Sequence, residues 1–138
     1  MDNTANAHHR IQLLTTIVDY SLGHKFIDIY RKGEVPISLI LHGNGAANSE
    51  IYDILGFGEP KKAIILSVLT ETMAQWMLHD LRVKMKFNKP GTGIAFTISL
   101  SSCSSILSQC CSTAVNKAQM EREEIHMMQK EPYDLILS

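Results

Sequence analysis

The stretch that decides the fold runs from Ile37 to Gly58 and reads ISLILHGNGAANSEIYDILGFG. An aliphatic run ends in two glycines one residue apart, Gly43 and Gly45, and a polar segment then leads to a second glycine pair. Ordered glycine costs conformational entropy, so such pairs are typical of a backbone that turns tightly or lets another group come close. The sequence therefore predicts a strand followed by a loop that contacts a ligand.

The sequence on either side of this loop predicts four strands and two helices. The clearest signal is at 94–100, where Ile, Phe, Ile and Leu alternate with smaller or polar residues, the period of a half-buried strand. Ser21 and Thr70 are predicted N-caps of the two helices, which end near Gly33 and Val83. The expected strands are 11–18, 35–42, 63–69 and 94–100.

This βαββαβ order is the split βαβ arrangement of a ferredoxin-like α+β sandwich, in which two helices cover one face of a four-stranded antiparallel sheet. The second and third strands carry aliphatic residues on both faces, although helices can cover only one of them. An uncovered apolar face is usually an association surface. The sequence therefore predicts an oligomer.

The two ends of the chain are expected to lie outside the ferredoxin-like domain, which spans 10–102. Residues 1–9 are polar and are expected to be disordered. The C-terminal extension, 103–138, begins with a Ser/Cys-rich stretch, so an irregular connection or a short helix is expected up to 113. A helix is predicted at 114–130 and a short strand at 133–137, which must pair with an edge of its own sheet or of a neighbouring subunit.

Composition excludes several classes of protein. The 138 residues are 45% hydrophobic, enough for one domain with a core, and the net charge of -1 gives no basic field for nucleic acid or a membrane surface. Cys103, Cys110 and Cys111 form no CxxC pair, so a reduced, cytoplasmic protein without a zinc site is expected. No run approaches the ~18 apolar residues of a membrane span, and no catalytic motif is present, so we expect neither membrane insertion nor an enzyme.

Two segments resemble a known family. HGNGAANSEIYDILGFGEP at 42–60 and KPGTGIAF at 89–96 resemble the PII-like signalling proteins, relatives of the nitrogen regulatory protein PII. The resemblance, which covers about residues 10–100, implies a homotrimer that binds a small effector, commonly an adenine nucleotide, in the clefts between subunits. It implies no other cofactor. It also implies that the loop at 43–60 changes shape with the ligand and is sensed by a target protein or transporter.

The same resemblance implies the residues of an effector site. Gly43 and Gly45 match the glycines that open the signalling loop, and 91–93 matches the Gly-x-Gly loop that lies against phosphates. Consecutive backbone N–H groups without bulky side chains form a concave anion site, and Lys89 is close enough in sequence to add a positive charge. The complete candidate set is Leu41, His42, Gly43, Asn44, Gly45, Ile64, Lys89, Gly91, Thr92 and Gly93.

Two other interpretations stay open. The first is a structural or metal-responsive trimer of the CutA type, with histidines or cysteines as ligands. The second is an acylphosphatase-like enzyme, which shares the βαββαβ order but needs an arginine in the first loop, where residues 19–25 have none.

The tail, MEREEIHMMQKEPYDLILS at 120–138, resembles the linker of PII-like chains that carry two domain copies in tandem. Residues 133–137 also repeat the pattern of 11–15, a polar second residue followed by aliphatic ones. The chain is therefore expected to be a shortened tandem protein or a trimmed one.

Overall fold

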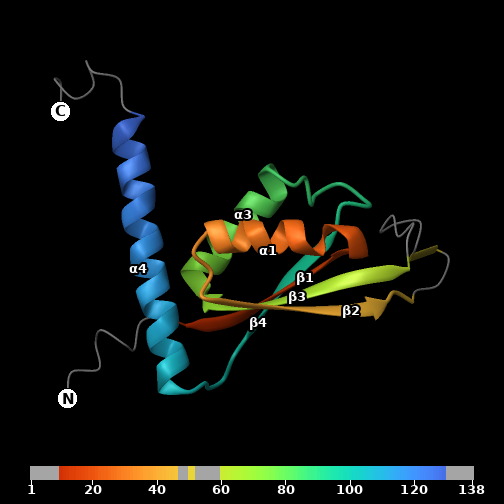
Figure 1. The fold of residues 1–138 in the computed structure, drawn as a ribbon, viewed down its shortest axis with the longest axis horizontal. Coiled ribbons are helices and arrows are strands. Elements are labelled where there is room, and N and C mark those ends of the chain that lie inside the picture. The colour runs from red at the N-terminus through yellow and green to blue at the C-terminus, as the bar shows by residue number, and fades with distance from the viewer. Residues whose placement is uncertain (1–9, 47–49, 52–59, 130–138) are drawn as a thin grey trace.

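The computed structural model describes residues 10–46, 50–51 and 60–129. The predicted α+β class and βαββαβ order are confirmed (Figure 1). The elements are β1 (Ile11–Asp19), the 3-10 helix η1 (Tyr20–Leu22), α1 (Gly23–Lys32), β2 (Ile37–Asn44), β3 (Lys61–Thr70), α3 (Glu71–Val83), β4 (Ile94–Ser99) and α4 (Ser105–Met128).

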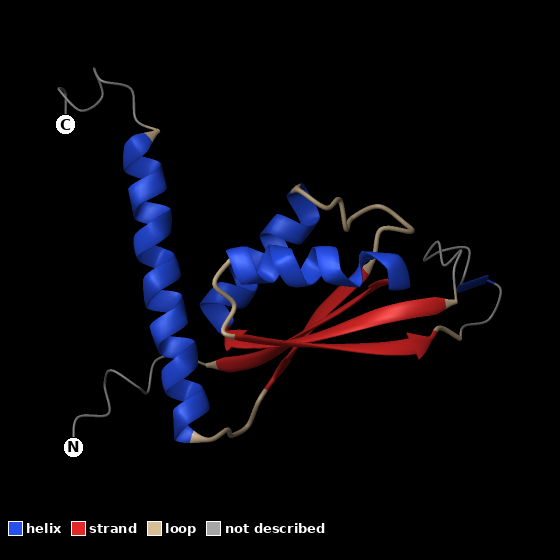
Figure 2. Ribbon diagram, in the orientation of Figure 1, coloured by secondary structure: helices blue, strands red, loops and turns tan. Residues whose placement is uncertain are grey.

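The four strands form one antiparallel sheet in the order β2-β3-β1-β4. Helices α1 and α3 lie together on one face of this sheet (Figure 2). β2 and β4 are therefore the two edge strands. The end of β2 and the start of β4 lie at the same end of the sheet, because β2 pairs antiparallel with β3 and both β3 and β4 pair antiparallel with β1.

The core lies between the sheet and the two helices. Side chains on the helix-covered face of the central strands pack against Phe26 and Tyr30 of α1 and against the buried methionines of α3. Successive side chains along each strand lie on opposite faces of the sheet. The strand residues that alternate with the core residues therefore point away from the helices. The core strand residues are Leu14, Val18, Ala63, Ile65 and Leu69, all at most 2% exposed.

The predicted N-cap is confirmed for α3 and wrong for α1. Thr70 is the N-cap of α3, since its hydroxyl accepts a hydrogen bond from the Met73 N–H at 3.2 Å, as predicted. The predicted cap at Ser21 is wrong, because Ser21 lies within η1 and α1 begins at Gly23 without a capping side chain. A Cβ at Gly23 would lie 2.5 Å from the Ile40 side chain, so close approach to the sheet fixes the start of this helix.

The second strand is displaced from its predicted range of 35–42 to 37–44. The Val35 N–H donates to the Tyr30 carbonyl at 3.0 Å, and Glu34 has a φ of 66°, so these residues form the turn that follows α1. The strand can begin only after this reversal. As a result it extends to Asn44 and includes the first glycine of the loop.

Helix α4 begins earlier than predicted. Within 101–113, expected to be an irregular connection or a short helix, residues 101–104 do form the connection, but the rest is the first part of one long helix, whose N-cap Ser104 accepts from the Leu107 N–H at 3.4 Å. The side chains at 111, 115 and 118, spaced as one helical stripe, are buried against the domain. This part of the extension therefore contributes to the core. The ranges 1–9 and 133–137 lie outside the described residues.

The face of the sheet opposite the helices, called the open face below, is almost entirely apolar. Its exposed members include Leu39 at 58%, Leu41 at 49% and Phe96 at 43%. The strand register arranges the face in three rows, with Thr15 as the one polar side chain in them. The rows are Ile37, Val68, Leu13 and Ile98; Leu39, Leu66, Thr15 and Phe96; and Leu41, Ile64, Ile17 and Ile94.

Buried Tyr30 makes the free energy of unfolding depend on pH in the alkaline range. Its hydroxyl is hydrogen-bonded to that of Thr16, and burial raises the pKa of Tyr30 to about 12, although the bond to Thr16 acts in the opposite direction. The native state holds the Tyr30 proton more tightly than the unfolded chain does. The contribution of protonated Tyr30 to the free energy of unfolding is therefore complete below pH 10 and is lost as pH rises from about 10 to about 12.

We expect Tyr30→Phe to lower the free energy of unfolding by about 1–3 kcal/mol at pH 7, because Thr16 loses its buried partner. It should also flatten the decline above pH 10. Urea unfolding at pH 7 to 11 measures both effects. Tyr20→Phe is the matched control, since Tyr20 is 50% exposed. Parallel alkaline slopes in wild type and Tyr30→Phe would contradict the assignment to Tyr30.

Candidate functional site

The loop that decides the fold leaves the sheet at the end of β2. Gly43 lies opposite Lys62 in the strand register, and Leu41 lies opposite Ile64. The Gly45 N–H donates to the Pro60 carbonyl at 2.6 Å, so the two ends of the loop are joined where it meets the sheet. The structure therefore brings together one group of predicted site residues, called the β2 group: Leu41, His42, Gly43, Asn44, Gly45 and Ile64.

Alternation along β2 divides this group between two faces. Leu41 and Gly43 belong to the open face, together with Ile64, whereas His42 and Asn44 belong to the helix-covered face. A Cβ at Gly43 would lie 3.1 Å from the Ile64 side chain. A ligand that contacts the whole group must therefore wrap around the edge strand.

A cavity of about 380 Å³ lies on the helix-covered side of this edge. The rings of Tyr20 and His42 are tilted against each other with centroids 4.5 Å apart. Neither Tyr20 nor Lys61 was among the predicted residues. Both could have been found from topology, since β1 ends, β2 ends and β3 begins at the same end of the sheet. The cavity is lined by Tyr20, His42, Gly43, Asn44 and Lys61.

A buried positive charge lies beside the glycines. The Lys62 ammonium is 2.6 Å from an Asp19 carboxylate oxygen, and the Lys62 side chain is only 6% exposed. A Cβ at Gly45 would be 3.6 Å from the Lys62 side chain. Asp19, Lys62 and Gly43 lie across from one another in the sheet. They form the row that follows the apolar rows of the open face, at the end where the loop begins.

The second group of predicted residues, Lys89 with 91–93, forms the turn before β4. The Thr92 hydroxyl is shared between the carbonyls of Lys86 at 2.9 Å and Lys89 at 2.8 Å, so it holds the turn together. Gly93 has a φ of 150°, and a Cβ there would lie 2.5 Å from the Phe87 ring. Packing against Phe87 therefore accounts for glycine at 93, and contact of this turn with phosphate remains a prediction.

The two groups lie at the same end of the sheet but on opposite edges (Figure 1). β3 and β1 separate them, and neighbouring strands are roughly 4.8 Å apart, so the edges are roughly 14 Å apart. A single chain therefore does not close one small site from both groups. A second copy of the chain is needed to bring a β2 group and a β4 turn together.

The cysteines differ in their surroundings. Cys103 and Cys110 are exposed, whereas Cys111 is buried, and burial followed by the charges of the two neighbouring cysteines raises the pKa of Cys111 to about 11. Cys111 is therefore held as a thiol that packs in the core.

Within 10–46, 50–51 and 60–129 no group of three or more His, Cys, Asp or Glu residues is arranged to hold a metal ion. In the same part of the chain, no helix combines the length and apolarity needed to cross a bilayer.

Comparison with known proteins supports the fold. No family model matches the chain, and no curated protein matches it significantly. CutA1 from Ehrlichia chaffeensis superposes with a TM-score of 0.57 at 12% identity, covering 78% of this chain and 97% of that one. CPII from Thiomonas intermedia K12, solved with ADP, AMP and acetate, gives 0.56 at 13% identity, covering 72% and 94%. CutA from Synechococcus elongatus PCC7942 gives 0.60 at 9% identity, covering 77% and 90%. The chain therefore has the ferredoxin-like fold that PII-like and CutA proteins share.

Proposed function

We propose that this protein is a homotrimeric, cytoplasmic regulator of the PII-like type. It binds a small anionic effector, an adenine nucleotide, between subunits, and it signals to a target protein or transporter through the loop at 43–60. The nucleotide is an effector and not a cofactor, and the protein is not an enzyme. The observation that carries the proposal is the open face, whose three apolar rows end beside Gly43 and the buried Lys62.

The geometry of the sheet supports a ring of subunits. The two edges of the sheet differ, so a contact in which one edge region meets the opposite edge region of the next copy is heterologous, and such contacts form rings when the rotation closes. Stacking open faces in a ring removes their apolar side chains from water. The same ring would place the β2 group of one subunit near the β4 turn of its neighbour.

The chemistry of the two groups suits a nucleotide. Lys61 and Lys89 carry positive charge to the two edges, and at Gly43, Gly91 and Gly93 no side chain shields the backbone from an anion. The tilted rings of Tyr20 and His42 offer an aromatic surface on which a base can stack. CPII, which shares this fold, was solved with ADP and AMP.

Isothermal titration with ATP, ADP, AMP and cyclic nucleotides tests the proposal. Gly93→Asp, the obvious variant, would disturb the packing of Phe87, so Lys61→Glu and Lys89→Glu are the better tests. We expect each to weaken nucleotide binding roughly tenfold, the value of one charge-assisted contact. Lys25→Glu, on the exposed side of α1, is the matched control with the same change in net charge. Absence of heat with every nucleotide, given a folded trimer, would remove the nucleotide from the proposal.

A metal-responsive trimer of the CutA type is the second candidate function, because CutA structures superpose as well as PII-like ones. One of these neighbours is described as a divalent ion tolerance protein. Metal analysis of protein purified without a His tag discriminates between the two. Stoichiometric copper or zinc would favour the CutA-type function, whereas the proposed regulator should contain neither.

A further inference from the structure

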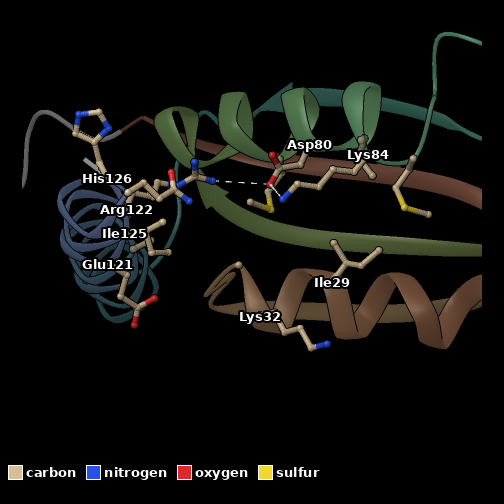
Figure 3. Close-up of a pocket in the computed structure, with 14 residues that line it drawn as sticks. Ile29, Lys32, Asp80, Lys84, Glu121, Arg122, Ile125 and His126 are labelled. Atoms are coloured by element: carbon tan, nitrogen blue, oxygen red, sulfur yellow. Dashed lines mark ion pairs between the residues drawn. The ribbon is translucent and has the colours of Figure 1, made fainter. Parts of the chain in front are cut away.

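A second cavity, far from the sheet end, lies where α4 meets the other two helices (Figure 3). It has a volume of about 530 Å³, within the range of roughly 300–1,000 Å³ typical of small-molecule sites. Its walls are the end of α1, the second half of α3 and the part of α4 beyond Ala118. It shares no residue with the cavity at the end of β2. We call it the α4 groove.

The floor of the groove is apolar, and it includes Ile29 of α1, Met77 and Leu81 of α3 and Ile125 of α4. Met77 and Leu81 belong to the core cluster, and Ile29 packs against it. Ile125 is 53% exposed, so it leaves apolar surface for a ligand to cover. An apolar chain or ring system placed here would be removed from water on several sides.

One end of the groove is charged. Asp80 lies between Lys84, with its ammonium 3.8 Å away, and Arg122, with its guanidinium 3.9 Å away (Figure 3). Two cations on one carboxylate leave a net charge of +1, and both distances are long for charge-assisted hydrogen bonds. The guanidinium also lies 4.4 Å above the Trp76 ring. A ligand carboxylate that contacts both Lys84 and Arg122 would therefore complete the charge balance.

We propose that the α4 groove binds an amphipathic monoanion, an organic carboxylate whose apolar body fits within about 530 Å³, such as a medium-chain fatty acid. The apolar body lies on the floor, and the carboxylate lies against Lys84 and Arg122. The part of α4 up to Ala118 is fixed by its buried stripe and by the Lys117–Glu34 ion pair at 3.4 Å. The part beyond Arg122 forms a wall of the groove, so occupancy stabilises the position of that part.

Decanoate is the probe, titrated at concentrations at which it is monomeric. Trp76 is the sole tryptophan of the chain, and its contact with Arg122 makes its fluorescence a reporter of the charged end. We expect saturable binding of one decanoate per chain, seen as a change in Trp76 fluorescence and confirmed by calorimetry. Decanol and decyltrimethylammonium, which have the same chain with a neutral or positive head, should bind at least tenfold more weakly.

Lys84→Glu and Ile125→Glu test the charged end and the apolar floor of the groove separately. Both side chains are largely exposed, so the fold should tolerate the changes. We expect each variant to weaken decanoate binding roughly tenfold or more. Lys25→Glu, which has the same charge change outside the groove, should bind decanoate like the wild type. Both groove variants should keep their nucleotide affinity, so failure here is distinguishable from failure of the nucleotide site. Absence of saturable binding, equal binding of decanol, or an unaffected Lys84→Glu variant would overturn the proposal.

Discussion

Leu39→Glu is expected to convert the proposed trimer into a monomer. Leu39 is at the middle row of the open face and is 58% exposed in the single chain, so the subunit itself loses little packing. In the proposed trimer the same position is covered by a neighbour, and a carboxylate there would be taken out of water without a partner. That costs roughly 2 kcal/mol or more per subunit and recurs in every copy of the ring.

Light scattering coupled to size exclusion measures the outcome. The wild-type mass should be three times 15.4 kDa, and the mass of the variant should fall to 15.4 kDa. Val83→Glu is the control, because Val83 is also 58% exposed but is the last residue of α3 and does not belong to the open face. An unchanged mass for Leu39→Glu, or an equal loss for Val83→Glu, would show that the open face is not the association surface.

Val115→Asp is expected to release α4 and to remove much of the stability of the subunit. Val115 is 1% exposed and belongs to the core cluster together with Ala118. The substitution removes the burial of an aliphatic side chain, about 1.5–3 kcal/mol, and adds a buried carboxylate without a partner. We expect a loss of roughly 3–5 kcal/mol, a large part of the 5–15 kcal/mol typical of a domain.

Chemical denaturation measures this loss. Ile106→Asp is the matched control, an aliphatic residue of the same helix that is 72% exposed, and its effect should stay within about 0.5 kcal/mol. Trp76 fluorescence should also change in Val115→Asp, since the contact with Arg122 depends on the position of α4. Equal stabilities of the two variants would mean that α4 is an appendage and not part of the domain.

The sequence predicted the fold because its elements are marked by local signals. Aliphatic runs and strict alternation marked the strands, and Thr70 marked the start of α3 through its capping hydroxyl. The start of α1 could not be predicted in this way, because it depends on how closely Gly23 approaches Ile40, a contact between distant parts of the chain. The start of α4 was missed because a Ser/Cys-rich segment has weak periodicity, and only the domain surface gives 111 and 115 something to pack on.

The candidate site was predictable only in part, for the same reason. The glycines and His42 stand in one continuous stretch, so their proximity follows from the sequence. Tyr20 reaches His42 only through the parallel course of β1 and β2, which flank β3, and the burial of Lys62 depends on Asp19 of another strand. Gly93 was predicted as a site residue because a glycine leaves the backbone open to an anion. In the structure it also packs against Phe87, a contact that the Gly-x-Gly motif does not reveal.

The bond between the Gly45 N–H and the Pro60 carbonyl separates the length of the intervening segment from the integrity of the sheet. Once the two ends are tied, doubling the number of residues between them costs only about 0.6 kcal/mol of closure entropy. Insertions and deletions there would leave the strand register untouched. The length of this one segment can therefore change while the scaffold beneath it stays the same.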